Sequence, residues 1–193
     1  TVIAGGVEFF DPAQPLPIKE YSTELLMGQT AERLASRLKI SREEQDAFAV
    51  RSHQRAVKAQ KEGIFRDNIV PVAIPGIGIV SLDNGPREDT TIEKISKLKG
   101  AFDPENGTVT AANSSFLTDG AAAVMLMSEE KAKALGLTAQ AYIKTFAHTA
   151  QNPLDELLLG PAFAVPKALA KAGLALKDIA VLEIHEAFAV QMI

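Results

Sequence analysis

The sequence contains no cysteine among its 193 residues. This absence excludes disulfide bonds, zinc-thiolate sites and a cysteine nucleophile within these residues. The sequence also lacks any apolar run near the roughly 20 residues that a membrane span requires, and it begins with a strand-like segment in place of a signal or transit peptide. Its formal net charge of −4 argues against a general binder of nucleic acid or of anionic membranes. The default expectation is a soluble, intracellular protein.

Apolar residues are abundant, at 47% of the chain, so the sequence can bury a core. Its length permits one large domain or two small ones, and no internal repeat, low-complexity tract or clean linker divides it. Helical periodicities alternate with short apolar runs, which predicts an α/β class. The segment from about Glu20 to Ala101 is interpreted as an insertion between two halves of a sheet-based fold.

Local patterns place most of the elements. Ser41 with Glu44 three residues later forms a capping box, which predicts a helix that runs to Gly63. Ser22 or Thr23 is expected to cap the preceding helix, whose apolar positions extend to residue 38. Further helices are predicted at 128–135 and 160–173 and near residue 91. Strands are predicted at 1–6 (a buried strand that ends in a glycine turn), 69–74, 77–82, around 109, and at 141–147 and 179–184. The apolar run 121–127 is interpreted as either a strand or a buried helix segment.

The segment Gly107–Gly120, with the sequence GTVTAANSSFLTDG, combines turn-forming, small and hydroxyl residues. Small side chains let a backbone approach a ligand closely, and the hydroxyls of Ser114 and Ser115 can donate and accept hydrogen bonds to an amide-bearing ligand. The alternative is a loop whose Ser and Asn side chains bind their own backbone, and composition alone favours this alternative. Both interpretations remain open at this point.

A basic cluster and one histidine are further candidates. Arg87, Lys94, Lys97 and Lys99 precede the small-residue loop, either as a solvated face or as an anchor for an anionic ligand. His185 follows the last predicted strand and precedes a helix, a position where α/β proteins often place their chemistry. In contrast, His53 is expected to be solvated or locally hydrogen-bonded, and His148 is expected to be structural.

Five strings together resemble the thiolase family across essentially the whole chain. They are AGGVE (4–8), MGQTAE (27–32), SREEQDAFAVRSH (41–53), GTVTAANSSFLTDGAAA (107–123) and EIHEAFA (183–189). Within that family, the TAANSSF sequence and the histidine at position 185 most resemble those of the β-subunit branch of the fatty-acid oxidation trifunctional complex.

The resemblance implies a layered αβαβα fold with a mostly helical inserted loop domain, of which this chain is expected to hold the middle portion. The implied divisions are 1–19 (end of the N-terminal sheet half), 20–115 (loop-domain insertion with the coenzyme A loop), 116–138 (return to the N-terminal sheet half) and 139–193 (start of the C-terminal sheet half). It also implies thiolytic cleavage of 3-ketoacyl-CoA by one cysteine nucleophile and a second cysteine that moves protons. Because the family places these cysteines before AGGVE and after EAFA, this chain alone is expected to be inactive.

The resemblance also assigns roles to individual residues. It places Ser115, with the small neighbour Ala112, against the pantetheine arm of coenzyme A, and Arg87 beside the nucleotide end. His185 takes the position of an asparagine that holds an oxyanion-hole water, a role that a neutral imidazole can fill because it also donates a hydrogen bond. Leu26 stands where many short-chain members carry histidine. Four residues match positions that line the pantetheine tunnel: Met27, Phe102, Ala187 and Phe188.

Two functions from different classes follow. The first is a piece of an acetyl-CoA C-acyltransferase of fatty-acid β-oxidation. The second is a non-catalytic thiolase-like protein that binds acyl-CoA or lipid, or serves as a partner subunit. For both we expect no permanent cofactor or metal, coenzyme A or acyl-CoA as substrate, and a homo-dimer or tetramer with a hydratase/dehydrogenase α subunit as a candidate partner. We expect no nucleic-acid partner and no transmembrane segment, and a location in the bacterial cytoplasm or the mitochondrial matrix.

Overall fold

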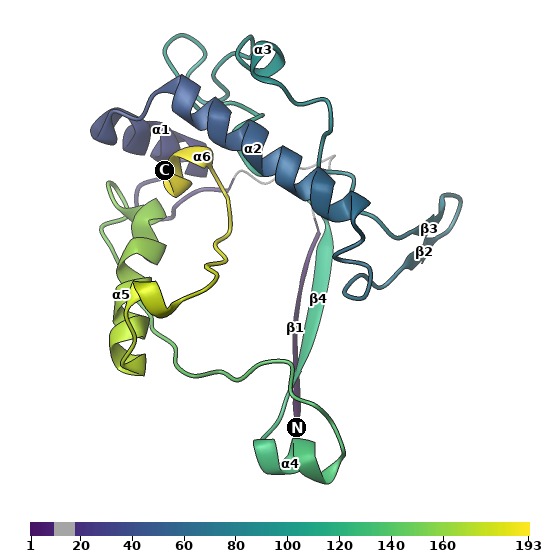
Figure 1. The fold of residues 1–193 in the computed structure, drawn as a ribbon. Helices are drawn as coiled ribbons and strands as arrows, with labels where there is room; N and C mark the ends of the chain where they lie inside the picture. Colours follow the sequence, from purple (N-terminus) through teal and green to yellow (C-terminus); the bar gives the residue numbers. More distant parts are fainter. Residues whose placement is uncertain (10–17) are drawn as a thin grey trace. The chain divides into compact units, whose positions relative to one another are not determined.

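The computed structural model describes residues 1–9 and 18–193, and these form two compact units. The first unit comprises Thr1–Glu24 and Leu117–Ile184, and the second comprises Leu25–Phe116 and His185–Ile193 (Figure 1). Part of the predicted 1–19 segment, residues 10–17, lies outside the described residues. No helix of the described residues is long and apolar enough to cross a membrane.

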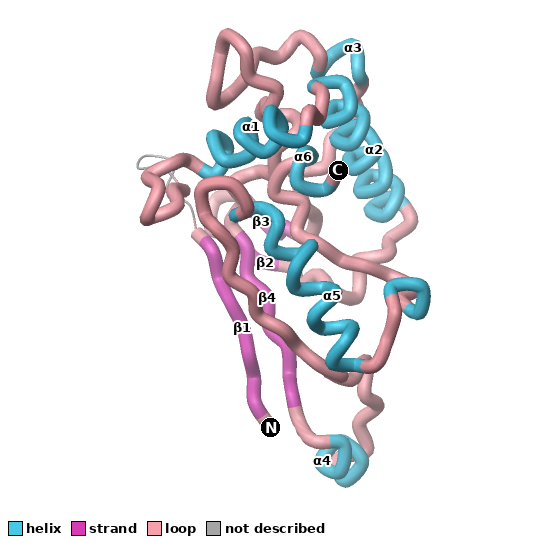
Figure 2. The backbone as a smooth tube through the Cα atoms, turned by 90° about the vertical axis from the view of Figure 1, so that its left-hand side faces the viewer, coloured by secondary structure: helices cyan, strands magenta, loops and turns pink. Residues whose placement is uncertain are grey.

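The first unit contains an antiparallel pair of strands, β1 (Val2–Glu8) and β4 (Gly120–Leu126). They lie side by side in Figure 2, with Val2 opposite Leu126 and Glu8 opposite Gly120. The prediction of a turn at Gly5 and Gly6 is wrong, because both glycines pair with alanines of β4 and continue the strand. The prediction that this strand is buried is also wrong, since large side chains on both faces are exposed.

The helices of the first unit follow their sequence signals. The predicted helix at 128–135 is confirmed as α4 (Glu129–Ala134), where the Ser128 hydroxyl accepts a hydrogen bond from the Lys131 N–H at 3.3 Å. The predicted helix at 160–173 is confirmed as α5 (Gly160–Ala172), which ends at Gly173 in the left-handed conformation with φ of 66°. Two short 3₁₀ turns, η1 (Leu157–Leu159) and η2 (Leu176–Asp178), flank α5.

The strands predicted at 141–147 and 179–184 are wrong, because neither segment has strand pairing. At the end of the first segment and just after it, main-chain carbonyls bind side chains of α5. Lys171 Nζ donates to the Phe146 carbonyl at 3.1 Å, and Lys167 Nζ donates to the His148 carbonyl at 3.0 Å. Both segments are apolar enough for strands, but pairing depends on a partner that local sequence does not specify.

The second unit is built on two helices, α1 (Met27–Leu38) and α2 (Arg42–Lys61). The Ser41–Glu44 capping box is confirmed, with Glu44 N–H donating to Ser41 Oγ at 3.2 Å and Ser41 N–H donating to Glu44 Oε2 at 2.8 Å. The prediction that Ser22 or Thr23 caps α1 is wrong, because the N–H groups of both residues bind the Glu20 carboxylate. Instead the Gln29 side chain accepts from the N–H of Leu26 at 2.9 Å, and the helix starts after Leu26.

The remaining elements of the second unit are short. The strands predicted at 69–74 and 77–82 are confirmed as the antiparallel hairpin β2 (Val72–Ile74) and β3 (Gly78–Val80), and α3 (Ile92–Ile95) forms near the predicted position. Helix α6 (Ala189–Met192) packs against both α1 and α2. The core of this unit gathers around these contacts, and its buried apolar residues are Ala31, Leu34, Ala35, Ala49, Ile95, Val109, Phe188, Ala189 and Val190.

Candidate ligand-binding site

The small-residue loop, residues 107–115, is anchored to α1 by one carboxylate. Glu32 accepts hydrogen bonds from the Thr108 N–H at 2.9 Å, the Thr108 hydroxyl at 3.1 Å and the Val109 N–H at 2.9 Å. The strand predicted around Val109 is therefore wrong, because its N–H groups bind this side chain in place of a neighbouring strand. The buried Gln45 adds a hydrogen bond from Nε2 to the Thr108 hydroxyl at 3.0 Å.

A buried ion pair anchors the loop to α2. The Asp46 side chain is 2% exposed, accepts from Arg42 Nε at 2.8 Å, and accepts from Asn113 Nδ2 at 3.0 Å. The same Arg42 also donates to the carbonyls of Ile95 and Leu98, at 2.7 and 3.0 Å. Buried charges are tolerated where they are paired and hydrogen-bonded, as they are here. Asp46 thus fixes α2 to the loop, and Arg42 fixes α2 to the end of α3.

Most polar side chains of the loop bind the loop itself. Asn113 Oδ1 accepts from the Thr110 N–H at 2.8 Å, and Ser114 Oγ donates to the Thr110 carbonyl at 2.7 Å. The alternative in which the loop satisfies its own backbone is therefore correct for Asn113 and Ser114. Ser115 differs, since its side chain is exposed and its hydroxyl takes part in none of the hydrogen bonds found in the part of the chain that the structure describes.

The loop is joined to a segment more than 70 positions later in the sequence. The Ser115 N–H donates to the Ala187 carbonyl at 2.8 Å, and the Ala189 N–H donates to the Asn113 carbonyl at 2.9 Å. The buried Phe188 meets Phe102 edge to face, with ring centroids 6.4 Å apart. Phe102 in turn covers Gly28 of α1, where an added Cβ would stand 2.0 Å from the Phe102 ring.

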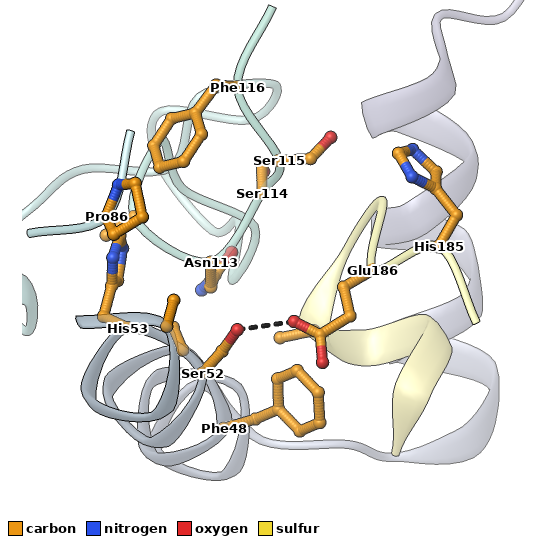
Figure 3. A pocket seen from close by; sticks show the side chains of 14 residues that line it. Phe48, Ser52, His53, Pro86, Asn113, Ser114, Ser115, Phe116, His185 and Glu186 are labelled. Atoms are coloured by element: carbon orange, nitrogen blue, oxygen red, sulfur yellow. Dashed lines mark hydrogen bonds between the residues drawn. The ribbon is translucent and has the colours of Figure 1, made fainter. Parts of the chain in front are cut away.

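Two pockets lie side by side at this site. The first, which we name the serine pocket, lies between α2, the loop and residues 185–189 (Figure 3). Ser115 and His185 line it, and Glu186 extends toward α2, where its carboxylate accepts a short hydrogen bond from the Ser52 hydroxyl. The other residues that line this pocket are Phe48, Ala49, His53, Ala56, Pro86, Ala112, Asn113, Ser114, Phe116 and Ala189.

The arginine pocket, the second hollow, carries most of the charge. Arg87 and Lys94 bring cations to it, and Asp89 lies between them, 3.7 Å from Arg87 Nε and 3.0 Å from Lys94 Nζ. The hydrogen bond and positive charge of Lys94, with a further contribution from Arg87, lower the pKa of Asp89, so its carboxylate offsets part of the cationic charge. The two pockets share three lining residues, His53, Ala112 and Phe116.

The structure brings together some of the residues predicted for the site and separates others. Ser115, Ala112 and His185 line the serine pocket, and Arg87 lines the arginine pocket. Lys97 and Lys99 of the predicted basic cluster line neither pocket. Four predicted tunnel residues, Met27, Phe102, Ala187 and Phe188, lie outside both linings, although the last three belong to the contacts behind the loop. The roles predicted for all of these residues stay predictions.

Sequence reasoning missed the face that α2 presents to the serine pocket. Phe48, Ser52 and Ala56 recur every four residues along this face, with Ala49 and His53 beside them. This spacing is the signal that could have found them. His53 does make a hydrogen bond, but its partner is the N–H of Arg87, 34 residues away. Among the described residues, no group of three or more His, Asp or Glu side chains is arranged to hold a metal ion.

Comparisons with known proteins agree on one family. Residues 5–130 match the family model described as "Thiolase, N-terminal domain", and residues 137–193 match "Thiolase, C-terminal domain". The chain is 51% identical over 187 residues to "Trifunctional enzyme subunit beta, mitochondrial" of Bos taurus, which covers 97% of this chain and 39% of that protein. It is 49% identical over 175 residues to "3-ketoacyl-CoA thiolase" of Yersinia enterocolitica, covering 90% of this chain and 40% of that protein.

The fold is shared with solved structures of the family. The chain superposes on the dimeric peroxisomal thiolase of Saccharomyces cerevisiae with a TM-score of 0.89 and 36% identity, covering 98% of this chain and 52% of that chain. This likeness confirms the predicted thiolase-like α/β fold. The chain spans about two fifths of the length of the curated relatives it matches, 39% and 40% in the two named above.

Proposed function

We propose that this chain, which belongs to the thiolase family, supplies the coenzyme A site of a 3-ketoacyl-CoA thiolase, an acyltransferase of fatty-acid β-oxidation. The sequence has no cysteine, so no residue here can form the acyl thioester. The chain alone therefore turns over no 3-ketoacyl-CoA, and it contributes binding and orientation. The relatives' names support the reaction class, since one is a 3-ketoacyl-CoA thiolase and another is a trifunctional enzyme subunit.

The observation that carries the proposal is that the two pockets share part of their lining. One hollow holds Arg87 and Lys94, the other holds the exposed Ser115 hydroxyl, and three residues belong to both. An elongated ligand that is anionic at one end and amide-bearing along its length fits this division. Coenzyme A has that chemistry, with phosphates for the cations and pantetheine amides for Ser115. Ala112, which lines both pockets, leaves room at their junction.

His185 is proposed to act at the acyl end of the ligand. Its side chain is exposed to the serine pocket, on the segment that the loop fixes through Ser115 and Ala187. A neutral imidazole can donate one hydrogen bond, either to a water or to the oxygen that becomes negative when a carbonyl is attacked. Such a donor lowers the energy of the charged intermediate without taking part in bond formation.

The proposal extends to assembly and location. A yeast relative is titled dimeric and another relative is a subunit β, so we propose a homo-oligomer with a hydratase/dehydrogenase α subunit as a further partner. The relatives include a mitochondrial protein and a bacterial one, which supports the mitochondrial matrix or the bacterial cytoplasm as its location.

A non-catalytic acyl-CoA-binding protein is the second candidate, because the chain has no cysteine. Both candidates use the same coenzyme site, so acylation separates them. The protein that carries this chain is incubated with a 3-ketoacyl-CoA, and its mass is then measured. A covalent acyl adduct on a cysteine supports the thiolase, and binding without an adduct supports the non-catalytic protein.

Substitutions at the two ends of the site test the coenzyme assignment in the same protein. Arg87→Ala should weaken coenzyme A binding by a factor that shrinks at high salt, because exposed charges are screened over about 10 Å at 0.1 M. Ser115→Ala should cost roughly 0.5–1.5 kcal/mol at either salt concentration, as expected for one neutral hydrogen bond. Calorimetric titration at 0.02 and 0.5 M salt measures both effects.

Lys97→Ala is the matched control, since Lys97 is an exposed cation of the same region that lines neither pocket. At 0.5 M salt it should leave the affinity unchanged within about twofold, because charges that do not contact the ligand are screened there, and at 0.02 M its loss should be smaller than that of Arg87→Ala. If the Arg87 and Ser115 variants show the same salt slope, or if neither loses affinity, the pockets do not form the coenzyme site.

A further inference from the structure

His53 lines both pockets and binds a backbone group of the arginine pocket. It comes from α2, lines both hollows, and accepts a hydrogen bond at Nδ1 from the N–H of Arg87 at 3.1 Å. Its ring also meets Phe116, with centroids 5.9 Å apart and an angle of 53°. The backbone at Arg87, which we call the Arg87 segment, is thus hydrogen-bonded to α2 through the imidazole of His53.

This hydrogen bond fixes the protonation state of the ring. A nitrogen that accepts a hydrogen bond carries no proton, so the neutral ring must carry its proton at Nε2. A doubly protonated imidazolium has donors at both nitrogens and would turn an N–H toward the N–H of Arg87. Protonation of His53 therefore replaces an attraction with a repulsion at this point.

We propose that His53 is a positioning residue whose neutral form latches the Arg87 segment to α2, so that ligand phosphates bind the arginine pocket only while His53 is unprotonated. The identity of the ligand rests on the proposed function, whereas the latch itself rests on the contact between His53 and Arg87. Nothing in the latch requires His53 to touch the ligand.

The surroundings of His53 favour the neutral form. Burial, and then the positive charge of Arg87, lower its pKa, while Asp89 acts in the opposite direction. Asp89 is itself engaged by Lys94 of α3, which weakens that opposition. The segment 185–189 brings His185 and Glu186 to the same pocket, where Glu186 is held by Ser52. The loop 107–116 contributes no titratable side chain.

The direction of the pH effect follows. A His53 ring released into water would have the ordinary histidine pKa of about 6.5, whereas in the latched position burial and then the Arg87 charge lower its pKa. The latch is therefore complete above pH 6.5 and is lost progressively as pH falls below 6.5, because the released state takes up the proton first. One proton limits the loss of affinity to about tenfold per pH unit.

Two measurements on the protein that carries this chain test the latch. The first is NMR of the ligand-free protein from pH 8 to pH 5. We expect the nitrogen shifts of His53 to report Nε2–H at pH 8, and the Arg87 amide to shift with the same midpoint as the ring. A ring protonated at Nδ1 at pH 8, or an Arg87 amide that does not follow the ring, overturns the proposal.

The second measurement is coenzyme A affinity against pH in the wild type and in His53→Gln. A glutamine oxygen can accept the Arg87 N–H but does not titrate, so this variant should lack the loss of affinity that the wild type shows below pH 6.5. The phosphates of the ligand titrate near pH 6, and the ratio of the two profiles removes their contribution. His148→Gln, in the other unit, should keep the wild-type profile.

The two results separate the latch from the function. A profile of His53→Gln parallel to that of the wild type overturns the latch even if coenzyme A binds tightly. If coenzyme A does not bind at any pH, the proposed function fails, and the NMR experiment alone then decides whether the latch exists.

Discussion

Ser114 and Ser115 are neighbours with different surroundings. The Ser114 hydroxyl is used within the loop, at 2.7 Å from the Thr110 carbonyl, whereas Ser115 turns its hydroxyl to the serine pocket. Composition predicts that such residues bind their own backbone, and that holds for the first serine. The orientation of the Ser115 hydroxyl depends on the hydrogen bond from the Ser115 N–H to the Ala187 carbonyl, and no local pattern connects these two residues. Sequence reasoning could therefore identify the loop but could not divide the roles within it.

Gly107 tests the anchoring of the loop at the residue scale. A Cβ there would stand 2.4 Å from the Asp103 carbonyl oxygen and 2.5 Å from Glu32 Oε1, so Gly107→Ala must shift backbone and displace the carboxylate that holds Thr108. We expect a loss of about 1–3 kcal/mol in the free energy of unfolding, as for other overpacked sites. Urea denaturation measures it.

The control is Gly6→Ala in β1, where an added Cβ meets nothing within 4 Å. It should change the unfolding free energy by no more than about 0.5 kcal/mol. Equal effects of the two substitutions would contradict the tight contact at Gly107.

The helices were easier to predict than the strands, because helix signals lie within a few neighbouring residues whereas a strand depends on a distant partner. The start of α2 was identified because Ser41 and Glu44 bind each other's backbone within four positions. The segments at 141–147 and 179–184 have the composition of strands, but a strand also needs a partner. The pairing of the loop with residues 187–189 was equally beyond local patterns. The family resemblance did place these strings in one fold, which the comparisons confirm.

The Asp46 ion pair tests how α2 holds the loop. Asp46→Ala removes the acceptor of both Arg42 Nε and Asn113 Nδ2 in a buried setting. Arg42 keeps its bonds to the Ile95 and Leu98 carbonyls, and Asn113 Nδ2 keeps its bond to the Thr108 carbonyl. The loss of hydrogen bonds to one buried carboxylate should therefore lower the free energy of unfolding by about 1.5–3 kcal/mol. Urea denaturation followed by circular dichroism gives this value.

An exposed pair at the other end of the same helix provides the comparison. Lys58 and Glu62 lie 3.7 Å apart, with side chains 74% and 52% exposed, so Glu62→Ala should cost less than about 1 kcal/mol. If Asp46→Ala and Glu62→Ala cost the same, the buried network does not hold the loop.

At the scale of the whole molecule, the two units differ in how much apolar surface they bury. Among the described residues, nearly all of the buried apolar residues belong to the second unit, and the first unit contributes Ala132. The sheet of β1 and β4 is apolar on both faces, and its large side chains remain in contact with solvent. On one face Ile3, Val7 and Met125 are 75%, 78% and 56% exposed, and on the other Val2 and Val124 are 61% and 59% exposed. Contiguous apolar surface of this kind promotes association.

We therefore expect the purified 193-residue chain to bind an environment-sensitive apolar dye strongly, or to self-associate at micromolar concentration. Replacing Ile3, Val7 and Met125 by threonine keeps residues that suit a strand while removing apolar surface from one face, so dye fluorescence should fall severalfold. As the comparison, threonine replaces three exposed hairpin residues of the second unit, Val72, Ile77 and Ile79. Dye fluorescence and sedimentation are measured for both variants. If the sheet variant binds as much dye as the wild type while the hairpin variant binds less, the exposed side chains of the sheet do not drive association.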